Sequence, residues 1–154
     1  MSVTYRRLTV DEFLSAHNLN ELIQAYADES AIDGMPRIKM HVETYKALEQ
    51  CGAGVAFGAF DEHNTIVGFI QVLTHTLPHY SAQVSVTESF YVTPECRKTG
   101  AGLRLLRMAE DYAREAGSVG LLVSAPTGGR LAAVLPNAGY AETNRVFFRN
   151  LSNV

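Results

Sequence analysis

A short polar loop between a predicted strand and a predicted helix carries residues that are suited to binding an anion. It reads Arg97-Lys98-Thr99-Gly100-Ala101-Gly102. Glycine has no Cβ, so Gly100 and Gly102 let the backbone approach a ligand closely and adopt positive φ. The start of a helix exposes unpaired N–H groups and the positive end of the helix dipole, and Arg97 and Lys98 add formal charge. We therefore expect a phosphate or pyrophosphate at this loop.

The loop matches neither of two common phosphate-binding motifs. No Gly-Lys-Ser/Thr ends it, as a Walker A loop requires. The third glycine of the dinucleotide fingerprint is also missing after Gly102. The plainer interpretation is an ordinary strand-to-helix turn, in which the glycines only make the turn tight.

The strand before the loop holds one carboxylate. Val84–Val92 is rich in β-branched and aromatic residues and is closed by Pro94, and Glu88 is its single charged residue. Such a carboxylate can act as a general base toward an amine, directly or through water. The alternative is a solvent-facing glutamate. His75 and His79 are alternative bases, although a lone histidine near a loop is more often polar surface.

These features together resemble the GNAT superfamily of acyl-CoA-dependent N-acyltransferases. The loop matches the family motif R/Q-x-x-G-x-G/A. The segment Glu88-x-Phe90-Tyr91-Val92-x-Pro94 is similar to the family's fourth strand, which usually reads Glu-x-Leu-x-Val-x-Pro. The resemblance implies that the loop amides hold the pyrophosphate of coenzyme A and that pantetheine pairs with the fourth strand. The residues expected to bind acetyl-CoA are Phe90, Tyr91, Val92, Arg97, Lys98, Thr99, Gly100, Ala101, Gly102 and Leu103.

The resemblance also implies catalytic roles. Amine-acetylating relatives often carry Glu at the position of Glu88, which is therefore our candidate for the base. A backbone N–H of the fourth strand, that of Tyr91 or Val92, would polarise the thioester oxygen. We accordingly predict Glu88 and Tyr91 as the catalytic residues and acetyl-CoA as the acyl donor. We expect no metal site, because the five histidines show no HExxH-type pairing.

The last motif of the family is present but lacks two side chains. The family commonly ends Asn-x-x-Ala-x-x-Leu-Tyr-x-x-x-Gly-Phe, whereas this chain has Gly129 in place of the Asn and, counted back from Gly139-Tyr140, Leu135 in place of the Tyr. That Tyr usually protonates the departing CoA thiolate, and Leu cannot. The thiolate of a thiol with a pKa of about 8.5 can leave unassisted. Alternatively, Ser124 or Tyr140 substitutes, although Tyr140 stands at a position expected in the core.

Two loops are expected to build the acceptor pocket, Asp28–Pro36 and Leu77–Ser81. Acidic side chains in the first, Asp28, Glu29 and Asp33, would attract a cationic amine, unless they form only a solvated turn. The acceptor is expected to be a small-molecule amine or a protein amine, and the sequence does not specify which.

The remaining pattern predicts one mixed α/β domain over residues 1–154. We expect strands at 3–10, 55–60, 66–74, 84–92 and 119–123, and one strand or a tight pair within 140–151. We expect helices over a segment capped by Asp11, over 41–50, from the glycine loop to Gly117, and over 130–137. The resemblance implies a GNAT-like fold. Its central sheet is mixed and mostly antiparallel, with six to seven strands of which the fourth and fifth splay apart, and about four helices flank it.

Composition limits the classes of protein that remain. Of 154 residues, 47% are hydrophobic and 19% charged, and the net charge of −3 argues against a nucleic-acid binder. No apolar run approaches the roughly 18 residues of a membrane-spanning helix, and the N-terminal residues lack the apolar core of a signal peptide. Cys51 and Cys96 are isolated, as expected for reduced thiols. We therefore expect a cytoplasmic protein that binds neither nucleic acid nor membrane.

The expected function is that of an enzyme, an acyl-CoA-dependent N-acetyltransferase. It would transfer acetyl from acetyl-CoA to a primary amine by direct attack in a ternary complex. The alternative, motivated by Leu135, is a non-catalytic acyl-CoA-binding or regulatory GNAT-like domain, and a use of the fold without a thioester is a more distant third. Besides the amine, a second copy of the chain in a homodimer is one option for a partner.

Overall fold

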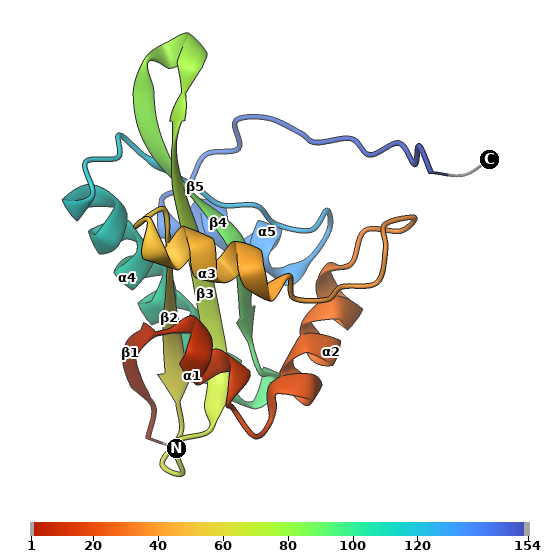
Figure 1. Cartoon of the computed structure of the whole chain (residues 1–154), viewed down its shortest axis with the longest axis vertical. Helices are drawn as coiled ribbons and strands as arrows, with labels where there is room; N and C mark the ends of the chain where they lie inside the picture. The colour runs from red at the N-terminus through yellow and green to blue at the C-terminus, as the bar shows by residue number, and fades with distance from the viewer. Residues whose placement is uncertain (1, 153–154) are drawn as a thin grey trace.

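One mixed sheet forms the centre of the protein in the computed structural model, which describes residues 2–152 (Figure 1). Its five strands lie in the order in which they occur in the chain. They are β1 (Thr4–Leu8), β2 (Gly54–Phe60), β3 (Ile66–Leu77), β4 (Ala82–Val92) and β5 (Leu121–Leu122). The first four pair antiparallel, and β5 pairs parallel with β4. The prediction of a mixed, mostly antiparallel sheet is confirmed.

Helices cover both faces of this sheet. They are α1 (Val10–Leu14), α2 (Leu19–Ser30), α3 (Val42–Gln50), α4 (Ala101–Glu115) and α5 (Arg130–Val134). Three short 3₁₀ helices, η1 (Pro78–Tyr80), η2 (Pro94–Thr99) and η3 (Leu135–Ala138), occupy turns. In Figure 1, α1, α2 and α3 lie in front of the sheet and α4 lies behind it.

A separate hydrophobic cluster fills each face of the sheet. On the α4 face, Leu105 and Ala109 are fully buried against Ile70 and Val72 of β3. On the α2 face, the cluster contains Leu22, Phe69 and Tyr91, with Phe13 and Tyr26 packed against it. Neighbouring side chains of β4, such as Tyr91 and Val92, belong to different clusters, because successive residues of a strand point to opposite faces.

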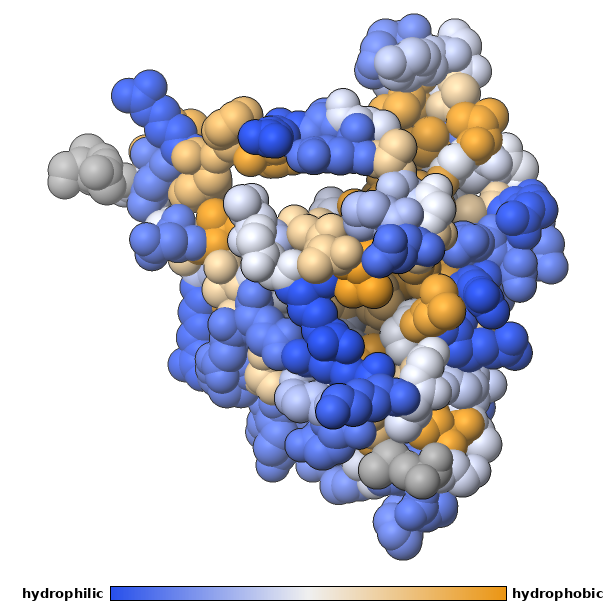
Figure 2. All heavy atoms as spheres, turned by 180° about the vertical axis from the view of Figure 1, so that it is seen from behind, coloured by the Kyte–Doolittle hydropathy of each residue, from blue (hydrophilic) through white to orange (hydrophobic). Residues whose placement is uncertain are grey.

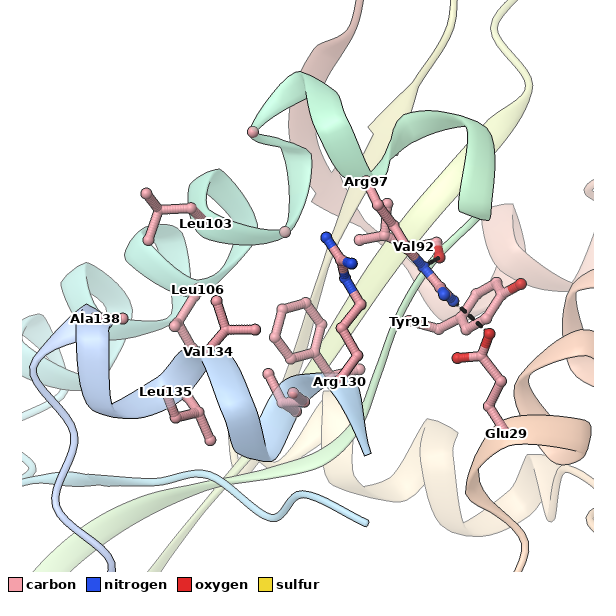
Figure 3. A pocket seen from close by; sticks show the side chains of 14 residues that line it. Glu29, Tyr91, Val92, Arg97, Leu103, Leu106, Arg130, Val134, Leu135 and Ala138 are labelled. Carbon is pink, nitrogen blue, oxygen red and sulfur yellow. Dashed lines mark hydrogen bonds and ion pairs between the residues drawn. The ribbon is translucent and has the colours of Figure 1, made fainter. Parts of the chain in front are cut away.

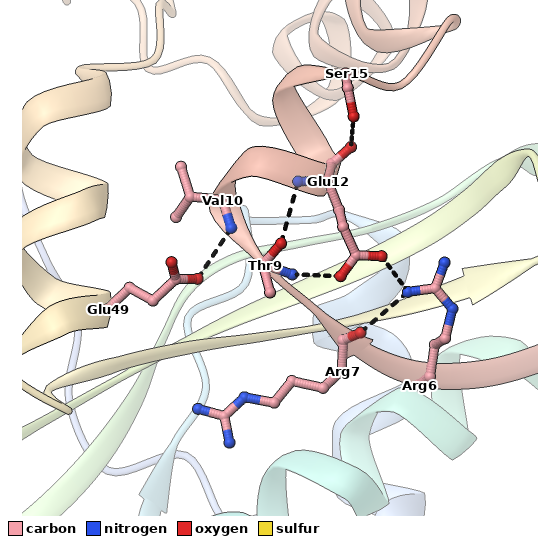
Figure 4. A network of polar contacts seen from close by, with 7 residues as sticks. All are labelled: Arg6, Arg7, Thr9, Val10, Glu12, Ser15 and Glu49. Atoms are coloured by element: carbon pink, nitrogen blue, oxygen red, sulfur yellow. Dashed lines mark hydrogen bonds and ion pairs between the residues drawn. The ribbon is translucent and has the colours of Figure 1, made fainter.

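The sequence predicted Asp11 as the N-cap residue of α1, but Thr9 occupies that position. The Glu12 N–H donates to Thr9 Oγ1 at 3.1 Å, and the Thr9 N–H donates to Glu12 Oε1 at 3.2 Å, which makes a complete capping box (Figure 4). Because α1 begins at Val10, β1 ends at Leu8, two residues before the predicted end of the first strand. Glu49 of α3 accepts a hydrogen bond of 2.9 Å from the Val10 N–H, which joins α3 to α1.

The glycine loop leads into α4 as predicted. Gly100 is the N-cap residue of α4 and has a φ of +84°. Other L-residues pay an energetic cost in this left-handed region, whereas glycine does not. The buried side chains of α4, among them Leu105, Ala109 and Ala113, repeat at helical spacing, so the amphipathic helix of the sequence is confirmed.

The predicted count of six to seven strands is wrong for the described residues, which hold five. The predicted strand at 119–123 shrinks to the two residues of β5, and residues 140–152 form no strand. This segment, which we call the C-terminal arm, spans open space and returns to the loop after α2, where Asn150 Nδ2 donates a hydrogen bond of 3.2 Å to the Gly34 carbonyl oxygen (Figures 1 and 2). A strand exists only where its backbone groups find a partner. Here Val146, Phe147 and Leu151 are 87%, 89% and 87% exposed.

The helix predicted at 130–137 changes its geometry in the middle. The α-helical part ends at Val134, and residues Leu135–Ala138 form η3. Pro136 has no N–H to donate to the preceding turn, which accounts for the change. With five α-helices and three 3₁₀ helices in residues 2–152, the count also exceeds the predicted four or so.

Candidate functional site

A bulge in β4 contains Glu88. Pairing with β3 runs from Gln71↔Ser89 to Val72↔Thr87, so Glu88 is an extra residue without an opposite partner. A β-bulge leaves one residue out of the ladder and re-aims its side chain.

The bulge decides which face of the sheet receives the Glu88 carboxylate. Strict alternation along β4 would place Glu88 on the same face as Phe90. Instead, Glu88 and Ser89 both line one cavity, while Phe90 and Val92 line another. The two cavities therefore lie on either side of β4, and the chain passes from one to the other within a few residues.

The first cavity, which we call the α3 cavity, has a volume of about 410 Å³. Residues of α1, α2, α3 and the 35–40 segment enclose it over β2, β3 and β4. The contact between Glu49 and the Val10 N–H lies in its wall and holds two of these helices together. This cavity is large enough to hold a small organic molecule.

Tyr45 of α3 holds the Glu88 carboxylate. Its hydroxyl donates a hydrogen bond of 2.7 Å to Glu88 Oε1. Burial first, and then the hydrogen bond to Glu88, raise the pKa of Tyr45. The hydroxyl therefore stays protonated, and it remains a donor, throughout the range of ordinary assays. Both residues line the α3 cavity.

The second cavity, which we call the α5 cavity, has a volume of about 230 Å³ and lies along Phe90, Tyr91 and Val92 (Figure 3). The start of α4 and the residues of α5 and η3 form its other walls. The parallel pairing of β4 with β5 covers only Ser85↔Leu121 and Val86↔Leu122, whereas β4 continues to Val92. The α5 cavity therefore lies along the part of β4 that no longer pairs with β5.

The glycine loop borders the α5 cavity with open space beside it. Gly100 and Gly102 both line the cavity. A Cβ built on Gly100 would meet no other atom within 4 Å, and one on Gly102 would lie 3.7 Å from Val92. Space next to the backbone of a glycine loop at a helix start suits an anionic group, as the sequence predicts.

Arg97 holds the glycine loop in place by contacts with β4 and α2. Its Nε donates a hydrogen bond of 2.9 Å to the Val92 carbonyl oxygen, and its guanidinium forms an ion pair with Glu29 at the end of α2. The guanidinium carbon also lies 5.6 Å from the centre of the Tyr91 ring. Figure 3 shows the side chain running along Val92 toward Glu29. Arg97 therefore fixes the loop to β4 and α2 in addition to lending charge to the cavity.

Most of the predicted acetyl-CoA residues lie together. Those that line the α5 cavity are Phe90, Tyr91, Val92, Arg97, Gly100, Gly102 and Leu103. Lys98, Thr99 and Ala101 are not among its lining residues. Ala101 is fully buried in the core, and the Thr99 hydroxyl donates to the Cys96 carbonyl oxygen at 2.6 Å. The two predicted catalytic residues do not line the same cavity. Glu88 lines the α3 cavity, whereas Tyr91 lines the α5 cavity.

Neither of the two hydroxyls considered as substitutes for the missing tyrosine lies in the α5 cavity. Leu135 lines this cavity and is 9% exposed. Tyr140, as expected, packs against the core, where burial and then the Glu110 carboxylate raise its pKa. Neither Tyr140 nor Ser124 lines either cavity.

The acidic residues expected around the acceptor lie elsewhere. Glu29 faces the α5 cavity and pairs with Arg97. Asp28 accepts a hydrogen bond of 2.8 Å from Gln24. Neither Asp28 nor Asp33 lines the α3 cavity, and the same holds for His75 and His79. Of the predicted loop Asp28–Pro36, Met35 and Pro36 line the α3 cavity, and the lining continues to Met40; no residue of the predicted loop Leu77–Ser81 lines it.

Two residues of the site escaped the sequence analysis. Arg130, the first residue of α5, lines the α5 cavity, and in Figure 3 its guanidinium points across it toward the glycine loop. A basic residue directly after Gly128-Gly129 was a signal that could have been used. Tyr45 lies 43 positions from Glu88 in the chain, and no local pattern links them.

Within residues 2–152, no group of three or more His, Cys, Asp or Glu side chains could hold a metal ion. No helix there is both long and apolar enough to cross a bilayer.

Solved structures share this fold over nearly the whole chain. A ribosomal-protein-alanine N-acetyltransferase from Brucella melitensis biovar Abortus 2308 has a TM-score of 0.70 and 21% identity, with 96% of this chain and 98% of that chain covered. An aminoglycoside acetyltransferase from an uncultured soil metagenomic sample, in complex with sisomicin, has a TM-score of 0.74 and 17% identity, with 97% of both chains covered. Glucosamine-6-phosphate N-acetyltransferase from Arabidopsis thaliana has a TM-score of 0.74 and 11% identity, with 99% and 100% covered.

A search of curated protein sequences finds no significant match. The profile of the acetyltransferase (GNAT) family, in contrast, matches residues 18–132, which include both Glu88 and the glycine loop. The match spans most of the chain and agrees with the splayed strand, the loop and the helix that follows it. The chain therefore belongs to the GNAT family of acetyltransferases.

Proposed function

We propose that this protein is an N-acetyltransferase that transfers acetyl from acetyl-CoA to a primary amine by direct attack in a ternary complex. The observation that carries the proposal is the pair of cavities on either side of the β4 bulge. One is bordered by an anion-binding loop and the other holds a carboxylate. A donor and an acceptor bound in them would meet at β4, which supports a transfer without a covalent enzyme intermediate.

The α5 cavity is suited to the acyl donor. Its glycine loop and the start of α4 offer N–H groups and the helix dipole to a pyrophosphate. Arg130 would add a positive charge from the opposite wall. Pantetheine would lie along the free edge of Phe90, Tyr91 and Val92. There the N–H of Tyr91 or Val92 would donate to the thioester oxygen as negative charge develops on it.

Glu88 would act as the general base. An amine must lose a proton to become a nucleophile, and the Glu88 carboxylate would accept it directly or through water. The nitrogen then forms a bond to the acetyl carbonyl carbon, and the bond between that carbon and sulfur breaks. Tyr45 would hold the carboxylate in position through its hydrogen bond of 2.7 Å.

The CoA thiolate would leave without help from a protein hydroxyl. Leu135 lines the cavity where the family commonly has Tyr. A thiol with an ordinary pKa of about 8.5 is a fair leaving group, so water can supply the proton. The net reaction yields an amide and CoA: the proton that Glu88 took from the ammonium is released to solvent, and the second proton, lost by the nitrogen after attack, passes through water to the thiolate.

Leu135 also favours a second candidate function, a domain that binds acyl-CoA without transferring it. The release of free CoA separates the two. Purified protein with acetyl-CoA and a panel of primary amines should release thiol only in the presence of an accepted amine. Calorimetric binding of acetyl-CoA without thiol release from any amine would favour the binding domain. The acceptor can be a small molecule or an amine on a protein, and the panel should contain both.

A further inference from the structure

The wall of the α3 cavity indicates which amines it takes. This inference rests on the proposed function, since it names the acceptor for the same site. The wall carries large apolar and aromatic side chains from several elements, among them Phe13, Ile23, Tyr26, Ile38, Met40 and Phe69. Phe13 and Tyr26 each meet the ring of Phe69 edge-on, with centroids 5.3 Å and 5.8 Å apart. A bound molecule therefore has an apolar body to match this surface.

The charges around the cavity match a single ammonium group. Four charged residues line it, and Glu49 and Glu88 balance Arg37 and Lys39. The Glu49 carboxylate accepts the Val10 N–H at 2.9 Å and the Glu88 carboxylate accepts the Tyr45 hydroxyl at 2.7 Å, so each has an oxygen left for a ligand. Glu88, however, lies in the bulge, two residues before Phe90, where the lining of the α5 cavity begins along β4. It is therefore the carboxylate available to an amine that is about to react.

A second positive charge on the acceptor would meet a wall of net positive charge, because Glu49 is the one carboxylate left against Arg37 and Lys39 once Glu88 pairs with the reacting amine. It would lie against apolar side chains, where an unpaired charge is costly. Arg37 and Lys39, which are exposed members of the wall, would also repel it within the roughly 10 Å over which charges act at ordinary salt. The acidic residues that could have drawn a polycation, Asp28 and Asp33, do not line the cavity.

We infer that the acceptor is a monoamine with an apolar body, aromatic or aliphatic, and that the α3 cavity discriminates against polyamines and other polycations. The amine meets Glu88, and the body lies against Phe69 and its aromatic neighbours. Discrimination comes from burying the second charge of a polycation against apolar side chains and close to Arg37 and Lys39.

A matched pair of amines tests this inference. Pentylamine and cadaverine have the same carbon chain and differ in one terminal ammonium group. At saturating acetyl-CoA, and after correction for the two equivalent amino groups of cadaverine, we expect kcat/KM for pentylamine to be higher by about tenfold or more. 2-Phenylethylamine should be at least as good as pentylamine. Equal or better use of cadaverine would overturn the inference.

Binding must be measured as well as turnover, so that failure of the proposed function can be told from failure of the inference about the acceptor. Calorimetric titration of both amines into the CoA complex gives the same comparison without chemistry. If neither amine releases CoA, the proposed function fails. The ratio of the two dissociation constants still decides the acceptor class. Tighter binding of cadaverine would contradict it, and tighter binding of pentylamine would support it.

A substitution in the apolar wall makes the test independent of ligand chemistry. Met40→Glu places a carboxylate in the wall, and Met40→Gln is the uncharged control of the same shape. We expect Met40→Glu to shift the preference toward cadaverine by about tenfold, the effect of pairing a charge that was unpaired. Met40→Gln should leave the preference near that of the wild type. Ile38→Glu and Ile38→Gln repeat the comparison if the Met40 variants do not fold. An unchanged preference in folded glutamate variants, with acetyl-CoA affinity retained, would show that the wall does not contact the acceptor.

Discussion

The Tyr45 hydroxyl donates a hydrogen bond of 2.7 Å to Glu88 Oε1, and this contact joins α3 to the bulge of β4. It restricts the carboxylate that lies where the two cavities approach each other. The donor is a phenol whose pKa is raised by burial, so the contact does not depend on pH under ordinary conditions. This relationship provides the first prediction.

Tyr45→Phe removes the donor and keeps the ring. We expect turnover to fall by about tenfold or slightly more, since loss of one hydrogen bond to a charged group costs about 1.5 kcal/mol. Acetyl-CoA affinity should not change, because Tyr45 does not line the α5 cavity. Steady-state kinetics with one accepted amine measures the effect. In a Glu88→Gln background the same substitution should cost much less, and an undiminished loss there would show that Tyr45 acts independently of Glu88.

Glu88→Gln removes the proposed base while keeping the size of the side chain. Turnover should fall by roughly 10²–10⁴-fold, the usual contribution of general acid–base catalysis. The loss should shrink as pH rises, because a larger fraction of the amine is then already neutral and needs no base. A pH–rate profile of both proteins checks this. Two superimposable profiles of equal height would remove Glu88 from the mechanism.

Gly100→Asp places a negative charge where the pyrophosphate is expected. A Cβ here enters open space, so a steric clash is not the cause, but the φ of +84° strains any side chain. Gly100→Asn is therefore the matched control, since it carries the same strain without the charge. Calorimetry should show acetyl-CoA binding lost in the Asp variant and largely kept in the Asn variant. Equal affinities in both would contradict the assignment of the loop to pyrophosphate.

Arg130→Gln removes the cation that faces the glycine loop from α5 (Figure 3). We expect the dissociation constant of CoA to rise by about fivefold to tenfold, as for a partly exposed contact between a cation and a phosphate. Binding of pantetheine, which has no pyrophosphate, should not change. Arg114→Gln is the control, because Arg114 pairs with Asp111 at the far end of α4. Equal losses for pantetheine and CoA would mean that Arg130 supports the cavity wall and not the phosphates.

Leu135→Tyr restores the hydroxyl that the family commonly has. Because Leu135 is buried in the core cluster of the α4 face, we expect no gain in turnover and a loss of about 1–3 kcal/mol in the free energy of unfolding, as for overpacking. Chemical denaturation and single-turnover kinetics measure the two effects. A faster variant would show that departure of the thiolate limits the wild-type reaction and that the cavity accommodates the ring.

Local pattern was enough to predict the strand, loop and helix that border the α5 cavity. The strand that ends at Val92, the glycine loop and α4 follow one another in the chain, so residue spacing and turn chemistry define them together. The positive φ of Gly100 and the buried stripe of α4 were predictable for this reason. The family resemblance pointed to Glu88, but only because its position in the motif is recognisable.

Tertiary structure decided the composition of the α3 cavity and the end of the sheet. Tyr45 lies 43 positions from Glu88, and Arg97 lies 68 positions from Glu29, so no window of sequence contains either contact. The bulge that turns Glu88 toward the α3 cavity is a property of how β4 pairs with β3, not of β4 alone. The C-terminal arm has the composition of a strand, but the described residues give it no neighbour to pair with. A helix satisfies its hydrogen bonds within its own segment, whereas a strand and a site formed by distant residues depend on what the rest of the chain brings beside them.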